Sequence, residues 1–353
     1  MIRNLHRGLP NIALAFLLGL AAVNKAGAAF SSSGVGTTTA NFLKLGVGAR
    51  CEAMGEACAA LTNDASALYW NPAALTLIPE KEGSLMLMHA PYLEPTYFDF
   101  AGYAQNTGSA GAFGLGMQYF SGGAITQTDT SGTSMGNFNP YDLAVSLGYA
   151  NSFYGFSFGV TGKYVESKLQ TSANAMAVDM GLLTPAYFHD RLRFAVVETN
   201  LGGRMTFDQQ SYGLPFNLKA GSALSLTPAW KATFDMNFPT DNNPYATIGS
   251  EYVWKIRSGW TMAGRVGYNG RSSGDIDGLS GPTAGFGLSM QSYSFDYAMV
   301  PMGALGLTHR ISFSMRFFTG ASNNALSKHA EAMSHDEQRA NNDVLLSDLI
   351  ANP

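Results

Sequence analysis

The feature that most constrains the fold of this chain is a two-residue alternation of apolar and polar side chains between about residues 84 and 318. In residues 230–238, the even-numbered positions are apolar, and the odd-numbered positions are lysine, threonine, aspartate and asparagine. In residues 310–317, the same alternation sets isoleucine, phenylalanine and methionine against arginine and serine. Because successive side chains of a β-strand point to opposite faces, each segment is predicted to be a strand with one apolar and one polar face.

Fourteen segments of this kind follow one another, and an even number is what a bacterial single-chain β-barrel requires. The predicted strands cover residues 84–91, 97–105, 112–120, 140–150, 154–167, 175–187, 191–199, 215–226, 229–238, 245–255, 259–269, 282–290, 292–300 and 308–318.

The predicted connections differ in length at the two ends of these strands. Those at 121–139, 200–214 and 270–281 are long and rich in turn residues, and each follows an odd-numbered strand. Those after even-numbered strands are mostly very short, as at 189–190 and 227–228. A soluble β-sandwich would share the alternation but would not usually segregate its loops in this way. The pattern therefore favours a transmembrane barrel with its long loops outside the cell.

The composition agrees with an amphipathic barrel wall. Hydrophobic residues make up 46% of the chain and charged residues 13%, and the mean hydropathy is zero. A wall that needs apolar side chains only at every second position averages to this value, and its lipid-facing side excludes charge. The net charge of −4 provides no basic surface for nucleic acid. We attribute the 40 glycines to the curvature of the wall and to tight turns.

The two ends of the chain lie outside the alternating region. Residues 1–28 are predicted to be a cleaved signal peptide, because Arg3 and Arg7 precede an apolar run at 12–23 and a small-residue cleavage site at 26–28. A buried N-terminal helix is the alternative. Residues 319–353 carry five acids and two bases, and we expect a polar, disordered periplasmic tail. Its last apolar group could instead form a short helix that docks on a partner.

Residues 29–82 are predicted to form a compact hatch that precedes the barrel at 83–318. Residues 49–61 are rich in alanine at helical spacing, and residues 63–66 offer caps for a second helix that ends near Tyr69. Pro72 should then turn the chain. A free periplasmic mini-domain is the alternative interpretation of this segment.

Cys51 and Cys58 are expected to be small packing residues. Seven positions on one helix correspond to about 10.5 Å of rise, which is too far for a disulfide. Redox or metal chemistry is less favoured for the same pair.

No sequence motif indicates catalysis. The six histidines never occur at metal-ligand spacing, and there is no nucleophile elbow, P-loop or dinucleotide fingerprint. We therefore expect no enzymatic activity, no cofactor and no metal. Charged residues on the polar strand faces either line a lumen and hold the hatch or are solvated residues of the wall. These are Asp235, Glu251, Arg265, Asp296, Arg310 and Arg316.

Two blocks resemble the PorV/PorQ family of outer-membrane proteins, within the FadL-like superfamily of 14-stranded barrels. The first block is residues 40–75, ANFLKLGVGARCEAMGEACAALTNDASALYWNPAAL, and the second is residues 295–317, FDYAMVPMGALGLTHRISFSMRF. The resemblance implies a structural hatch in the first block and a closing hairpin in the second. The matching residues are Gly48, Arg50, Asp64, Tyr69, Trp70, Asn71 and Pro72 in the hatch, and Asp296, Tyr297, Gly303, Gly306, His309 and Arg310 in the hairpin.

The resemblance implies an all-β protein of the outer membrane, with a 14-stranded antiparallel FadL-like barrel and a small helical N-terminal hatch. It also implies one of two roles. The first is protein secretion or surface attachment of the type IX kind, in which the external loops contact secretion components or secreted proteins. The second is FadL-like transport of fatty acids or hydrocarbons, which requires an apolar pocket between hatch and wall. A continuous polar lumen without such a pocket would count against transport.

Overall fold

The computed structural model describes residues 30–92, 95–272 and 277–319. The predicted signal peptide at 1–28 lies outside these residues, as does the predicted tail beyond residue 319. Within the described part of the chain, no helix reaches the length and hydrophobicity needed to cross a membrane.

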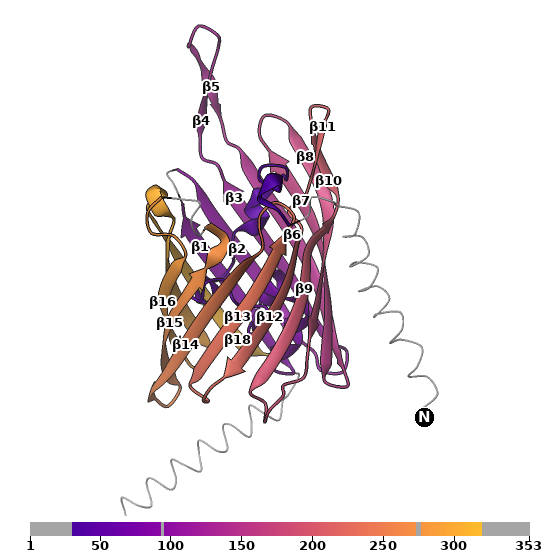
Figure 1. Cartoon of the computed structure of the whole chain (residues 1–353), viewed down its shortest axis with the longest axis vertical. Helices are drawn as coiled ribbons and strands as arrows, with labels where there is room; N and C mark the ends of the chain where they lie inside the picture. Colours follow the sequence, from indigo (N-terminus) through magenta and orange to yellow (C-terminus); the bar gives the residue numbers. More distant parts are fainter. Residues whose placement is uncertain (1–29, 93–94, 273–276, 320–353) are drawn as a thin grey trace, which may run out of the picture. The chain divides into compact units, whose positions relative to one another are not determined.

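Fourteen antiparallel strands close into a barrel in which β1 pairs with β18, as predicted (Figure 1). The barrel strands are β1 (Glu82–Pro91), β2 (Tyr97–Asn106), β3 (Ala112–Ser121), β6 (Tyr141–Phe153), β7 (Phe156–Lys168), β8 (Ser172–Leu183), β9 (Leu192–Gly202), β12 (Asn217–Ser225), β13 (Trp230–Pro239), β14 (Tyr245–Arg257), β15 (Trp260–Asn269), β16 (Pro282–Met290), β17 (Tyr293–Pro301) and β18 (Leu307–Phe318).

The two faces of each strand lie as the alternation predicts. Apolar residues such as Leu147 and Ile311 point outward and are 68% and 56% exposed. Polar residues on the opposite face, such as Asp235 and Asn237, are buried inside the barrel. An apolar outer surface around a polar interior is the arrangement of a barrel that contacts lipid.

Two of the predicted long loops contain strands of their own. Strands β4 (Ile125–Thr128) and β5 (Ser134–Phe138) form a hairpin between β3 and β6, and β10 (Arg204–Phe207) and β11 (Gln210–Gly213) form another between β9 and β12. Figure 1 shows both at the same end of the barrel, which we call the loop end. The opposite end, with its short connections, is the turn end.

The hatch, residues 30–81, lies inside the barrel and runs from the loop end to the turn end. At the loop end, Lys44 Nζ lies 2.8 Å from a carboxylate oxygen of Asp241, in the connection between β13 and β14. At the turn end, Asn106 donates from Nδ2 to the carbonyl of Ile78 at 2.7 Å. The helical segments of the hatch are η2 (Ser32–Gly34), η3 (Asn41–Lys44), α2 (Ala49–Glu52), α3 (Ala67–Trp70) and η4 (Pro72–Leu77).

The prediction of one long helix over residues 49–61 is wrong. The helix α2 ends at Glu52, because Gly55 and Glu56 adopt left-handed backbone angles with φ of +66° and +67°. The second predicted helix is present as α3, and Pro72 begins η4 as the next turn. The side chain of Asn71 caps η4 by accepting a hydrogen bond from the backbone N–H of Ala73.

A belt of glycines on the inner face of the wall makes room for the hatch. A Cβ at Gly249 would lie 2.6 Å from the carbonyl oxygen of Met54, and one at Gly285 would lie 2.6 Å from the Cβ of Ala53. The belt consists of Gly102, Gly114, Gly148, Gly159, Gly181, Gly221, Gly249, Gly267 and Gly285. Curvature and turns alone are therefore an incomplete explanation of the glycine content, because these strand glycines allow the hatch to touch the backbone of the wall.

We predict that Gly267→Ala lowers the stability of the protein. A Cβ at this position would overlap the backbone of Met54 and Gly55, and overpacking of this kind costs about 1–3 kcal/mol of unfolding free energy. Gly162→Ala on β7 is the matched control, because nothing lies within 4 Å of its Cβ. Chemical unfolding in detergent micelles and proteolysis of the hatch measure the effect. Equal stability of the two variants would contradict the role of the belt.

Candidate functional site

A buried network of charges joins the hatch to the wall. Arg50 on α2 donates from Nε and Nη2 to the two carboxylate oxygens of Glu251 on β14, both at 2.8 Å. Arg265 on β15 bridges Glu251 and Asp296 on β17 at 2.8 Å and 2.7 Å. Glu251 is only 2% exposed and Asp296 8%. These strand charges therefore hold the hatch, and the alternative that they are solvated wall residues is wrong.

A second buried ion pair lies beside the first network. Arg310 on β18 approaches Glu52 at the end of α2 at 2.9 Å, and it also donates from Nη2 to the hydroxyl of Tyr92 at 2.6 Å. Burial raises the pKa of Glu52 above the usual range of a carboxyl group, while the charge of Arg310 opposes this effect. Arg316, further along β18, donates to the carbonyl of Asn63 in the hatch at 2.9 Å.

The residues that the first sequence block singled out build the frame of the hatch. Trp70 donates from Nε1 to the carbonyl of Val47 at 2.8 Å, and Asn71 donates from Nδ2 to the carbonyl of Ala59 at 2.7 Å. Asp64 accepts a hydrogen bond from the backbone N–H of Ser66 at the start of α3. Gly48 precedes α2 with a φ of +81°, a conformation that favours glycine. The roles that we assign to these residues are structural.

The residues of the closing hairpin are divided between the two faces of the wall. Asp296 and Arg310 point inward and take part in the buried ion pairs described above. Tyr297 and His309 lie on the outer face, where the hydroxyl and Nδ1 are 2.6 Å apart. The connection between them contains η6 (Gly303–Leu305), and Gly303 and Gly306 adopt the positive φ angles of +60° and +95° that its turn requires.

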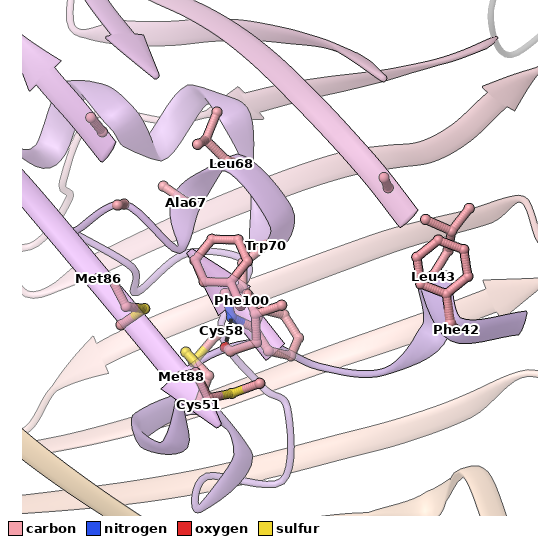
Figure 2. Close-up of a cluster of buried hydrophobic side chains, with 14 of the residues drawn as sticks. Phe42, Leu43, Cys51, Cys58, Ala67, Leu68, Trp70, Met86, Met88 and Phe100 are labelled. Carbon is pink, nitrogen blue, oxygen red and sulfur yellow. Dashed lines mark hydrogen bonds between the residues drawn. A yellow bond between two sulfur atoms is a disulfide. The ribbon is translucent and has the colours of Figure 1, made fainter. Parts of the chain in front are cut away.

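Cys51 and Cys58 form a disulfide, so the expectation that they are unbonded is wrong. Their Cα atoms lie 5.9 Å apart, because the chain reverses at Gly55 and Glu56 and does not continue as a helix. The two sulfur atoms belong to a buried apolar cluster with Trp70 (Figure 2). The glycine at position 55, inside the assumed helix, is the sequence signal that could have revealed the turn.

The apolar cluster also fixes the hatch to the first strands of the barrel. Figure 2 shows Met86 and Met88 of β1 and Phe100 of β2 close to Trp70 and Leu68 of the hatch. All five side chains are at least 96% buried. Methionine adapts to irregular gaps, which suits the contact between a curved wall and a hatch with short helices.

A cavity of about 290 Å³ lies between the hatch and the wall at the loop end. Its lining combines polar and charged side chains with apolar ones such as Val35, Leu43 and Pro215. It includes Lys44, Glu56, Tyr69, Trp70, Lys163, Asn200, Asn217, Lys219, Asn237, Asp241, Tyr245 and Arg271. The lysines and Asn237 are not among the site residues predicted from the sequence, although inward-pointing lysines in strands are a detectable signal. Tyr69 and Trp70 are the only residues of the predicted hatch set among those that line this cavity.

Most cations of the cavity have acidic partners. Arg271 lies 2.5 Å from Glu56, and Lys163 lies 2.6 Å from Asp179. Asp179 also accepts a hydrogen bond from the backbone N–H of Asn200, where the register of β8 and β9 shifts. The irregular place in the wall is thus filled by a buried ion pair.

The apolar outer face, the closed sheet and the internal hatch define an integral outer-membrane β-barrel protein. Residues 29–233 match the family described as "Type IX secretion system protein PorV", and the chain belongs to this family. No curated protein is detectably similar in sequence.

Solved structures with a similar fold include a transporter, a FadL homologue and a channel. The toluene transporter TbuX of Ralstonia pickettii has 12% identity and a TM-score of 0.48, with 77% of this chain and 97% of that chain covered. A FadL homologue of Pseudomonas aeruginosa has 13% identity and a TM-score of 0.46, with 80% and 98% covered. The deltaS2 mutant of the TodX monoaromatic hydrocarbon channel has 13% identity and a TM-score of 0.49, with 77% and 98% covered. Similarity at this level says nothing about the ligands of this chain.

We predict that Glu251→Gln weakens the attachment of the hatch. The change leaves Arg50 buried without its carboxylate, and breaking one side of a buried ion pair costs about 3–5 kcal/mol of unfolding free energy. The double variant Arg50→Met with Glu251→Met should lose less, because no unpaired charge remains at that contact. Hydrogen exchange in the hatch and chemical unfolding measure both, and Glu80→Gln at an exposed position is the control. A larger loss in the double variant would contradict this account.

We predict that the disulfide stabilises the hatch. It closes a loop between residues seven positions apart, and a loop of this size accounts for about 2 kcal/mol in the chain-entropy description. The variant Cys51→Ala with Cys58→Ala should unfold at lower denaturant concentration than the oxidised protein. A reducing agent should lower the stability of the natural protein only. An unchanged midpoint in the double variant would show that the bond is dispensable.

Proposed function

We propose that the protein supports protein secretion or surface attachment, and that its loop end contacts secretion components or secreted proteins. Membership of the PorV family supports this role. The observation that carries it is the hatch, which fills the barrel and is held by buried ion pairs to β14, β15, β17 and β18. A filled barrel favours a rigid platform over a pore that runs straight through the wall.

The two hairpins provide the surface for such contacts. The hairpin β4–β5 is exposed along nearly its whole length and carries the apolar side chains of Ile125 and Met135, which are 45% and 65% exposed. In this proposal, the exposed apolar side chains of the hairpin contact the partner protein. In this proposal the loop end faces the outside of the cell, and the turn end faces the periplasm after export by the predicted signal peptide.

Transport of hydrophobic molecules is less well supported by the interior. The cavity between hatch and wall is lined by charged and amide side chains together with apolar ones such as Leu43 and Trp70, whereas transport of this kind needs a predominantly apolar pocket. Where the register of β8 and β9 is irregular, the wall holds the buried ion pair of Lys163 and Asp179 and has no apolar opening among the described residues. We propose no enzymatic activity.

Deletion of the gene is expected to reduce the amount of surface-attached and secreted protein. A variant in which a short glycine–serine turn replaces residues 125–138 should show the same defect while its barrel remains folded. A matched replacement of residues 107–111 at the turn end is the control and should secrete normally. Proteomics of the medium and of the cell surface measures the effect. Unchanged secretion, together with loss of growth on hydrophobic solutes, would favour transport and contradict the proposal.

A further inference from the structure

We propose that the loop-end cavity binds the carboxylate group of a small polar molecule, and that Lys219 and Asn237 are the residues that recognise it. This inference does not depend on the role in secretion. It rests on a buried cation whose acidic partner is beyond hydrogen-bond distance and on two buried amide atoms of cavity-lining residues that have no hydrogen-bond partner in the described part of the chain.

Lys219 is a buried cation that forms only a long ion pair. Its side chain on β12 is 9% exposed, and Asp235 lies 3.9 Å away, which is longer than a hydrogen bond. On another side, the ammonium group lies 4.9 Å from the centre of the Trp70 ring. The other three cations of the cavity differ in this respect, because Lys44, Lys163 and Arg271 each have a carboxylate within 2.8 Å.

Asn237 lies directly across from Lys219 in the register of β12 and β13. Side chains opposite each other in an antiparallel pair have Cβ atoms about 4.5–5.5 Å apart, so a single carboxylate can contact both. The Oδ1 atom of Asn237 accepts a hydrogen bond from Asn217 at 3.0 Å. In the described part of the chain, the buried Nδ2 of Asn237 and Oδ1 of Asn217 have no hydrogen-bond partner.

These three groups define the chemistry of the ligand. The ammonium of Lys219 and the amide N–H of Asn237 are donors, and an anionic acceptor satisfies both. The free Oδ1 of Asn217 accepts, so the ligand also carries an N–H or O–H donor. Leaving buried polar groups unsatisfied is costly, and a carboxylate with a neighbouring donor would remove that cost.

The position and size of the cavity limit the ligand to a small molecule from the loop end. Val35, at the edge of the lining, is 64% exposed, which places the mouth at that end of the barrel. The volume of about 290 Å³ is at the lower limit for ligand pockets, which span about 300–1,000 Å³. The charged and amide groups of the lining suit a molecule of the size of a blocked amino acid better than a lipid tail.

Binding of N-acetylglycine to the full chain in detergent micelles tests the proposal by isothermal titration calorimetry. N-acetylglycinamide, which has the same shape without the charge, should bind at least about tenfold more weakly, since a charge-assisted hydrogen bond contributes about 1.5–3 kcal/mol. Lys219→Met should cause a similar loss. Lys255→Met, at an exposed position on β14, is the matched control and should bind normally.

Three results would overturn the proposal: no binding of N-acetylglycine to the natural protein, equal binding of the acid and the amide, or unchanged binding by Lys219→Met. If Lys219→Met does not fold, Asn237→Ala takes its place and should weaken binding of the acid more than binding of the amide. The comparison of acid with amide on the natural protein needs no variant, and it remains decisive in every case.

Discussion

The close approach of the hatch backbone to the glycines of the wall is the contact on which the rest of the structure depends. A side chain at Gly249 or Gly267 would occupy the space of Met54. The hatch also has small residues at these contacts. Ala53 packs against Gly285, and Ala59 packs against Gly221. Close packing of this kind leaves no space for water at these glycine contacts. The sequence of the wall and the sequence of the hatch therefore constrain each other, although they lie far apart along the chain.

Buried charges also fix the hatch against the wall. Removing an ion from water is costly unless a partner of opposite charge replaces the water. In this protein one partner comes from the hatch and the other from the wall, as with Arg50 and Glu251 or Glu52 and Arg310. Withdrawal of the hatch would separate these charges inside a largely enclosed barrel. The ion pairs thus select one position of the hatch, while the glycine belt supplies the room for it.

The sequence predicts the barrel well because burial imposes its pattern on every strand. Residues 230–238 alternate because one face of β13 meets the interior and the other faces outward. The hairpin β4–β5 has no buried face. Its apolar and polar residues therefore need not alternate, and the sequence predicts only a loop there. The alanines of residues 49–61 are spaced as in a helix, so the sequence predicts a continuous helix there. The structure instead has a chain reversal at Gly55 that brings Cys51 close to Cys58. The cross-strand pair of Lys219 and Asn237 becomes visible only when the strand register is known.

The interior of the barrel is held by many contacts, whereas the hairpin β4–β5 at the loop end makes few. The disulfide lies within the hatch, and ion pairs and apolar packing join the hatch to the inner wall, so opening this region requires many interactions to break together. The hairpin β4–β5 at the loop end buries little and can change shape or sequence at low cost. Binding surfaces are commonly carried by such loops on a rigid scaffold. In the proposed role, the filled barrel is the support that holds the loop end in place, and partner selectivity would come from the hairpins and from the cavity at the loop end.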